Sequence, residues 1–218
     1  LNYDQEAYDH LSTHGNCLPS EKYYFKEGIT YSGSGSKGIS YRYFQPNCIF
    51  DVGGSCGFPI KEFKNNYYIL AFMNSKISYY FVDCLNPTVN NQVGDLKRIP
   101  FAQPQKDIEN KVAQLAQENV SIKKHLCEFS IVEMHYKHSP LIWAKEKTGS
   151  NDLRKLIKMY LDYENEQLAK VFVNETEIDE LIFEVYELSD EDKQMVLEKE
   201  GLPIGSYSQE ANEETKRK

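Results

Sequence analysis

Three short runs of apolar and aromatic residues near the start of the chain predict a small sheet. The runs are Gly28–Ser32, Ile39–Phe44 and Cys48–Val52, and residues rich in glycine, proline and asparagine separate them. β-Branched and aromatic residues bounded by such turns are typical of strands. The stretch Gly53-Gly54-Ser55 is expected to end the third strand.

The spacing of apolar residues then becomes helical. Over Tyr67–Leu85 they recur at three- and four-residue intervals, which predicts one helix. Asn65 or Asn66 is expected to cap its start, and Asn86-Pro87 ends it because proline has no amide donor. A short extended segment, Val93–Phe101, is expected to close this part of the chain.

Helical periodicity dominates the second half. One helix is expected to start at Gln103–Gln105 and to carry three apolar residues on one face: Ile108, Val112 and Leu115. Asn119-Val120 is expected to interrupt it, and residues 119–150 are predicted to be irregular to helical.

Three more helices are predicted towards the end. Ser150-Asn151 precedes an apolar stripe at Leu153–Leu161, and Ile178–Tyr186 has the same spacing. Ser189, with Asp192 at the third helical position, starts a last helix that ends at Gly201.

These patterns predict an α+β fold. Residues 1–101 are expected to form a mixed-β domain with a packed helix. Residues 102–205 are expected to form a helical spacer and a helical C-terminal region, and the polar residues 206–218 a disordered tail.

Charge is distributed unevenly. The net charge of the 218 residues is −8; residues 1–101 hold nine Lys/Arg and nine Asp/Glu, and residues 102–218 hold sixteen and twenty-four. The first part can therefore face phosphates, whereas the second is too acidic to bind a polyanion as a whole.

Other features indicate a cytoplasmic protein. No apolar run approaches the ~20 residues of a membrane span, and no signal segment is present. The five cysteines are odd in number and lack a CxxC pair, which favours reduced thiols. Because the chain starts at Leu1 rather than at Met, we expect it to be cut from a longer protein.

Two glycine- or proline-containing segments have alternative interpretations. Gly33–Gly38 lacks the spacing of a P-loop, and it is either a flexible hairpin loop or a loop that contacts the DNA backbone. Asn86-Pro87-Thr88-Val89 is similar to a loop that holds a flipped base, but it lacks the second proline and the aromatic residue. A helix stop is the simpler interpretation.

A group of histidine and cysteine residues suggests a zinc site or a thiol nucleophile. Its members are His125, Cys127, His135 and His138. A structural zinc site usually has paired ligand spacings, and a nucleophile needs a third orienting group. We therefore favour packing or surface histidines, with no metal.

Several blocks in a fixed order resemble the target-recognition region of adenine-specific DNA methyltransferases of BREX phage-defence systems and of fused type II restriction-modification enzymes. The blocks are Lys26–Ser32, Ser40–Tyr43, Ile49–Ser55, Leu70–Lys76, Leu85–Phe101, Glu118–Lys124 and Asn174–Ser189. One departure is Glu187, where the resemblance implies a glycine that ends a helix.

The resemblance implies a division of labour. This part would recognise double-stranded DNA, and a catalytic domain outside the chain would bind S-adenosylmethionine and methylate adenine. The chain itself contains no glycine loop for that cofactor and no Asn/Asp-Pro-Pro-Tyr/Phe loop. Catalytic residues and cofactors are therefore expected to be absent from it.

Residue type and position suggest which side chains contact DNA. Arginine pairs with guanine, and lysine, serine and tyrosine meet phosphates or base edges. The candidates are Lys37, Arg42, Tyr31, Ser34, Ser36, Tyr41, Lys97 and Arg98. Surface or internal ion pairs remain the alternative for Arg42, and ordinary solvated charge for Lys97 and Arg98.

A second function is a docking module. The stripes at Leu153–Leu161 and Ile178–Tyr186 would then hold the catalytic domain or another subunit of a defence complex, although such stripes more often form a core. An independent hydrolase or nuclease is disfavoured, because no paired carboxylates with a lysine stand out.

Overall fold

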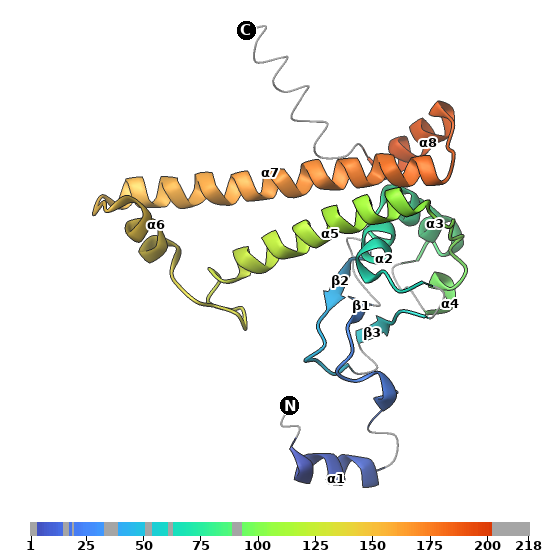
Figure 1. Ribbon diagram of the computed structural model, residues 1–218, viewed down its shortest axis with the longest axis horizontal. Coiled ribbons are helices and arrows are strands. Elements are labelled where there is room, and N and C mark those ends of the chain that lie inside the picture. The colour runs from blue at the N-terminus through green and yellow to red at the C-terminus, as the bar shows by residue number, and fades with distance from the viewer. Residues whose placement is uncertain are drawn as a thin grey trace, which may run out of the picture.

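The computed structural model describes residues 4–14, 18, 20–32, 39–50, 54–60, 63–88 and 93–201. It is α+β, as the sequence predicts (Figure 1). The elements are α1 (Gln5–Thr13), η1 (Glu21–Tyr23), β1 (Gly28–Ser32), β2 (Tyr41–Phe44), β3 (Gly54–Gly57), α2 (Asn66–Met73), α3 (Lys76–Leu85), α4 (Val93–Leu96), α5 (Lys106–Cys127), α6 (Pro140–Thr148), α7 (Leu153–Val185) and α8 (Asp190–Glu200).

The sheet is antiparallel, with strand order β2-β1-β3. Its first two strands match the predicted runs, but the third was predicted wrongly. β1 pairs with Gly54–Gly57, whereas Cys48–Phe50 form no strand. The physical reason is close approach: a Cβ on Gly28 would lie 2.3 Å from the carbonyl oxygen of Gly57. The glycine-rich segment thus supplies strand backbone as well as a turn.

The predicted helix over residues 67–85 is two helices. Asn65 caps α2 by accepting a hydrogen bond from the Tyr68 N–H at 3.1 Å. The buried Ser75 caps α3, so the chain turns between Met73 and Lys76. α3 ends at Leu85, as predicted. Residues 93–96 form the short helix α4 rather than an extended segment.

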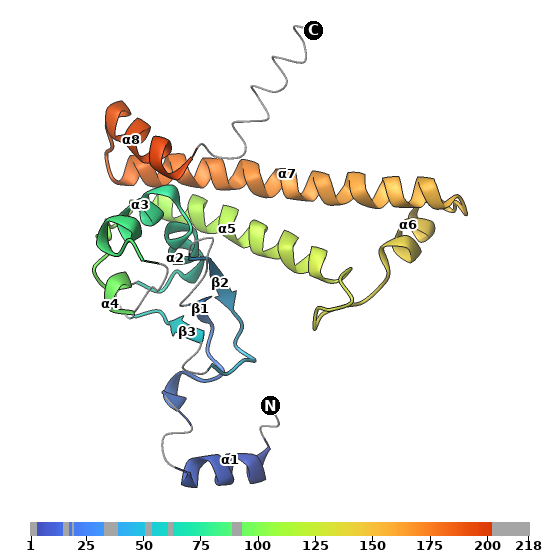
Figure 2. The same cartoon turned by 180° about the vertical axis from the view of Figure 1, so that it is seen from behind.

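Two long helices, α5 and α7, form a hairpin, with α6 at one end of α7 and α8 at the other (Figures 1 and 2). The predicted break at Asn119 is wrong. Its side-chain oxygen accepts a hydrogen bond from the Asn174 amide at 2.9 Å, so this polar group is satisfied inside the helix pair. The two predicted helices at 153–161 and 178–186 are one 33-residue helix.

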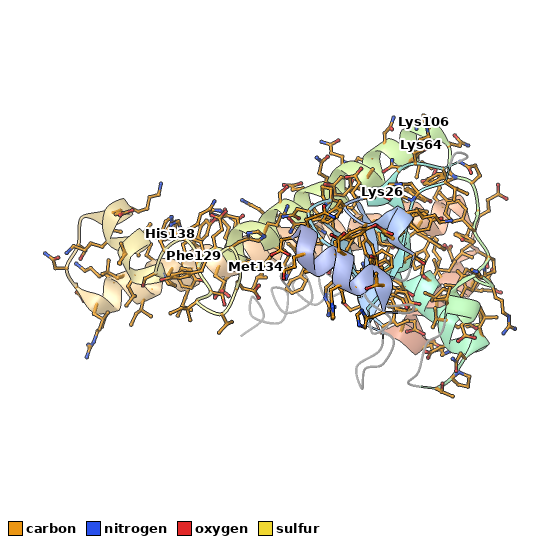
Figure 3. All side chains as sticks on the ribbon, turned by 90° about the horizontal axis from the view of Figure 1, so that it is seen from below. Lys26, Lys64, Lys106, Phe129, Met134 and His138 are labelled. Atoms are coloured by element: carbon orange, nitrogen blue, oxygen red, sulfur yellow. The ribbon has the colours of Figure 1, made fainter. Side chains whose placement is uncertain are left out.

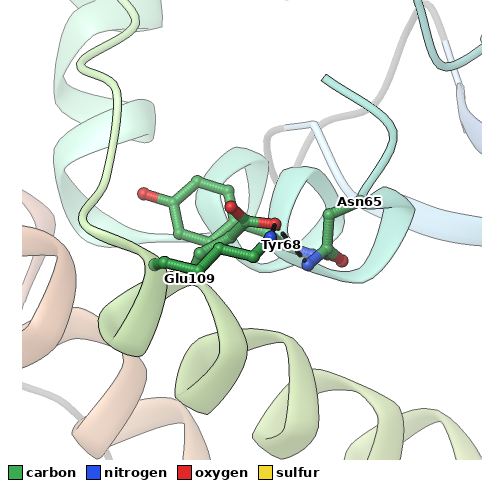
Figure 4. Close-up of polar contacts among 4 residues, drawn as sticks. Asn65, Tyr68 and Glu109 are labelled. Carbon is green, nitrogen blue, oxygen red and sulfur yellow. Dashed lines mark hydrogen bonds and ion pairs between the residues drawn. The ribbon is translucent and has the colours of Figure 1, made fainter. Parts of the chain in front are cut away.

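The core is continuous from the sheet to the helical hairpin. Tyr68 of α2, Val112 of α5 and Ile182 of α7 are fully buried in one cluster. Asn65 also donates to the Glu109 carboxylate at 2.9 Å, which joins α2 to the first turn of α5 (Figure 4). A domain boundary near residue 101 stays a prediction, because this core extends across it.

The two ends of the hairpin differ. At the α8 end, Ser189 caps the helix as predicted: its hydroxyl accepts from the Asp192 N–H at 3.2 Å and donates to the Asp192 carboxylate at 2.7 Å. At the α6 end, a separate aromatic cluster surrounds the buried Phe129. Its other rings are His125, His138, Trp143, Tyr160 and Tyr163.

Candidate nucleic-acid interface

One face of the sheet packs against α2. On the other face, here called the outward face, Phe44 is buried against Phe50 and Phe58. The strand register places Arg42 beside Thr30 and Thr30 beside Cys56 in a single row across the three strands. The alternate residues Ile29 and Tyr31 are buried. Because side chains alternate across a strand, Arg42 lies on the outward face, and it is exposed.

The backbone on either side of Arg42 is fixed by side chains of other segments. The Tyr41 N–H donates to the Asn74 oxygen at 3.1 Å, and the Asn74 amide donates to the Tyr41 carbonyl at 3.0 Å. Tyr43 stacks on Tyr67 with ring centroids 5.3 Å apart, and its hydroxyl donates to Glu27 at 2.7 Å. Arg42 therefore projects from a pinned edge strand, which favours a defined direction for its guanidinium.

Tyr31 and Tyr41, two of the predicted DNA-contact residues, lie in the core. Only 5% and 4% of their surfaces are exposed, and their ring centroids are 5.5 Å apart. Among the described residues neither hydroxyl has a hydrogen-bond partner. Burial, and then the neighbouring Tyr31, raise the pKa of Tyr41 above its usual value. Contact of these two rings with DNA would require the sheet to leave α2, so the candidate interface consists of exposed residues.

The remaining predicted DNA-contact residues fall into two groups, one outside the described residues and one exposed on the surface. Lys37, Ser34 and Ser36 lie outside the described residues. Lys97 and Arg98 are exposed directly after α4, and neither forms an ion pair with the described part of the chain. α4 is held to the end of α3 by a 2.8 Å hydrogen bond from Asn86 to Asp95. The four predicted basic residues are thus not shown to form one cluster.

An aromatic and basic segment before β1 was not among the predicted DNA contacts. Tyr23 stacks on Phe58 with ring centroids 4.8 Å apart. The Nζ atoms of Lys22 and Lys26 lie 4.9 Å and 5.8 Å from the centroid of the Tyr23 ring. The run Lys-Tyr-Tyr-Phe-Lys at residues 22–26 is visible in the sequence, and basic residues interleaved with aromatic ones are a known signal for nucleic-acid contact.

The basic side chains labelled in Figure 3, Lys26, Lys64 and Lys106, lie at the sheet-bearing end of the molecule. Phe129, Met134 and His138 lie along the other arm in the same view. Lys124 of α5 adds a further charge near the sheet, with its Nζ 5.9 Å from the Tyr43 ring centroid. Because Tyr43 stacks on Tyr67 of α2, Lys124 lies on the α2 side of the sheet, and Lys106 is paired with Glu109 at 3.0 Å. These lysines therefore surround the sheet-bearing end without forming a basic patch on the outward face.

The described residues contain no group of histidine, cysteine and acidic side chains arranged to hold a metal ion. His125 instead pairs with Glu128 at 3.3 Å, and His138 packs on Phe129. Burial raises the pKa of the Cys127 thiol, which makes it a weaker nucleophile at neutral pH. In the same part of the chain, no helix has the length and apolar character needed to cross a membrane.

The chain is similar to enzymes of one class, the adenine-specific methyltransferases. One relative is the adenine-specific methyltransferase BrxX of Escherichia coli O9:H4 (strain HS), which is 31% identical over 125 residues. Another is the adenine-specific methyltransferase PglX of Lacticaseibacillus casei (strain Zhang), which is 24% identical over 195 residues. No protein-family model matches the chain.

The similarity covers much of this chain but little of either relative. It includes 57% of the chain and 10% of BrxX, and 84% of the chain and 15% of PglX. A relationship to adenine-specific methyltransferases is thereby supported, as the sequence blocks indicate. Correspondence to a target-recognition region stays a prediction.

Proposed function

We propose that the chain is the DNA-recognition module of an adenine-specific DNA methyltransferase of a phage-defence or restriction-modification system, acting in the cytoplasm. The observation that carries the proposal is the outward face of the sheet, where Arg42 is exposed on a strand pinned by Asn74 and Tyr43. A small region of a long enzyme that presents arginine on a rigid strand suits base-edge recognition, because arginine pairs bidentately with guanine. The similarity to BrxX and PglX supports it.

In this proposal the chemistry belongs to another part of the enzyme. S-adenosylmethionine would bind there, and the target adenine would be methylated there. Phosphate contacts by exposed lysines would set the position of the duplex, and base contacts near Arg42 would select the sequence. Lys97, Arg98 and the loop with Lys37 are the further proposed contacts.

The test is a fluorescence-anisotropy titration of the 218-residue chain against a pool of random-sequence duplexes at low and moderate salt, followed by sequencing of the bound fraction. We expect salt-dependent binding and an enriched motif. Arg42→Ala should relax one position of that motif, at a cost of about 1–3 kcal/mol in binding free energy. The exposed Arg154→Ala on α7 is the matched control. Absence of binding to any duplex at low salt would contradict the proposal.

A second candidate function, docking, is favoured by a specific surface. Leu153, Ile157 and Leu161 are spaced four residues apart on α7, with 56%, 43% and 47% of their surfaces exposed. Nearby in sequence, Ile131, Val132 and Met134 are at least 80% exposed. Apolar surface of this kind marks contact with another protein surface. We name the three α7 residues the distal stripe.

The occupant tested is the methyltransferase portion of the same enzyme, expressed separately. Labelled wild-type chain should bind it, and Ile157→Glu should weaken binding at least tenfold, because burying one unpaired carboxylate costs more than ~1.4 kcal/mol. Lys170→Glu, further along α7, is a control for charge. Equal binding by all three chains would remove the distal stripe from consideration.

A further inference from the structure

The segment before β1 and the end of β3 form a surface that the proposed function leaves unused. We name it the aromatic–lysine rim; it consists of Lys22, Tyr23, Phe25, Lys26 and Phe58. Three of these residues, Tyr23, Lys26 and Phe58, line a shallow hollow of about 370 Å³ together with Glu27 and Pro59. Gly28 allows Phe58 to pack close to β1, because a Cβ at position 28 would lie 3.1 Å from the Phe58 ring and would also clash with the Gly57 carbonyl.

Phe25 is held outward by its backbone. Its φ angle is 59°, and 51% of its surface is exposed. A bulky residue in the left-handed region costs about 1–2 kcal/mol. The Phe25 N–H donates to the Cys48 carbonyl at 3.1 Å, which holds the strained turn. About half of the Phe25 side chain is thus presented to solvent, where it can contact a ligand.

The charge of the rim is available to an anion. Lys22 and Lys26 are exposed, and neither forms an ion pair with any described residue. The neighbouring Glu27 keeps its negative charge, and a hydrogen bond from the Tyr43 hydroxyl holds its carboxylate towards Tyr43. Two ammonium groups that have no ion pair within the described part of the chain therefore lie beside the Tyr23 ring.

Rings between cations match the chemistry of a nucleotide. Aromatic side chains stack on bases, lysines meet phosphates, and apolar rings inserted between base pairs unstack them. Inside an intact duplex the base faces are covered, so a ring can reach one only where a step opens. We infer that the aromatic–lysine rim engages DNA at an opened base step, with Phe25 or Tyr23 against the base and Lys22 and Lys26 at the flanking phosphates. This inference rests on the proposed DNA-recognition function.

The experiment compares two probes that differ only in base stacking. One is a fully paired 24-base-pair duplex, and the other is the same duplex with a single-nucleotide bulge. A bulge has already lost its stacking, so the 218-residue chain should bind it about tenfold more tightly. Phe25→Leu and Tyr23→Leu, which remove a ring but keep an apolar side chain, should reduce this preference to about twofold or less. The exposed Tyr136→Leu on the distant arm should retain it.

The lysines give a different signature. Lys22→Ala and Lys26→Ala should weaken binding of both probes alike and each lower the salt slope by about one. Lys145→Ala and Lys147→Ala on α6 are the matched pair for charge. Binding of the paired duplex without any preference for the bulge would overturn the inference and leave the proposed function standing. A preference that survives both ring substitutions would also overturn it. No binding of either probe would reject the proposed function and the inference together.

Discussion

Asn74 takes the place of a neighbouring strand for Tyr41. Its side-chain oxygen accepts from the Tyr41 N–H at 3.1 Å, and its amide nitrogen donates to the Tyr41 carbonyl at 3.0 Å and to the Leu70 carbonyl at 3.0 Å. β2 is the edge strand of the sheet, so these bonds cover backbone groups that an edge leaves open. One side chain thus joins the end of α2 to the strand that carries Arg42.

Asn74→Ala should therefore lower stability by about 2–3 kcal/mol, because partly buried backbone groups lose their partners. Urea unfolding measures this loss, and the exposed Asn151→Ala is the control. If Asn74 also positions Arg42, the substitution should weaken DNA binding at temperatures where the chain remains folded. A change below about 0.5 kcal/mol would show that water replaces the side chain.

Glu187 occupies a position suited to glycine. Its φ angle is 51°, its N–H donates to the Glu184 carbonyl at 2.9 Å, and the Leu188 N–H donates to the Phe183 carbonyl at 3.2 Å. This is the Schellman arrangement at a helix C-terminus. Glu187→Gly should raise the free energy of unfolding by about 0.5–1 kcal/mol by removing strain. Glu187→Ala should gain little, because alanine keeps a Cβ, and an equal gain from both variants would rule out this explanation.

Asp179 should make stability depend on pH. Burial raises its pKa to about 7, although the Lys76 N–H at the start of α3 donates to it at 2.9 Å. In the unfolded chain its pKa is near 3.8. The folded state thus holds the proton more tightly, and this contribution is fully present below about pH 4 and is lost as the pH rises to about 7.

Asp179→Asn keeps the acceptor oxygen and removes the ionisation. Unfolding free energies measured between pH 4 and pH 8 should decline less for this variant than for the wild-type chain. The exposed Glu146→Gln should leave the decline unchanged. The explanation fails if Asp179→Asn and the wild-type chain show the same pH dependence.

Asn65 and Glu109 should be energetically coupled. Burial opposes ionisation of Glu109, but hydrogen bonds from Asn65 and then Lys106 outweigh it and lower the pKa of this carboxyl. Asn65→Ala should cost about 2–4 kcal/mol, since it removes both the α2 cap and a bond to a charged group. In a double-mutant cycle with Glu109→Ala, which removes the acceptor, a coupling energy near zero would contradict the direct link shown in Figure 4.

The places of helices in the second half of the chain could be predicted because apolar spacing is a local property, but the lengths of α5 and α7 could not. The starts of α2 and α8 also followed from their caps, Asn65 and Ser189. The continuity of α5 could not be predicted, because the group that satisfies Asn119 is Asn174, 55 positions away. β3 was missed for a related reason: Gly57 matters through its approach to Gly28 on another strand.

In the candidate site, too, local features could be predicted from the sequence, whereas contacts between distant segments could not. Arg42 was selected from residue type, and the structure does expose it. The burial of Tyr31 and Tyr41 depends on which face of the sheet α2 covers, and strand alternation alone does not determine that. The Lys22–Lys26 segment was visible as a sequence run, but its significance depends on Phe58, which β3 brings beside it.

The single unbroken helix α7 also connects the two ends of the molecule through one continuous element. Its 33 residues span about 50 Å at 1.5 Å per residue, from the sheet-bearing end to the distal stripe. A rotation of about 6° at one end displaces the other by about 5 Å over that length. A small rotation of the sheet when it binds a ligand would therefore shift the far end of α7 by about the length of a side chain. A partner bound at the distal stripe would be displaced without contacting the ligand.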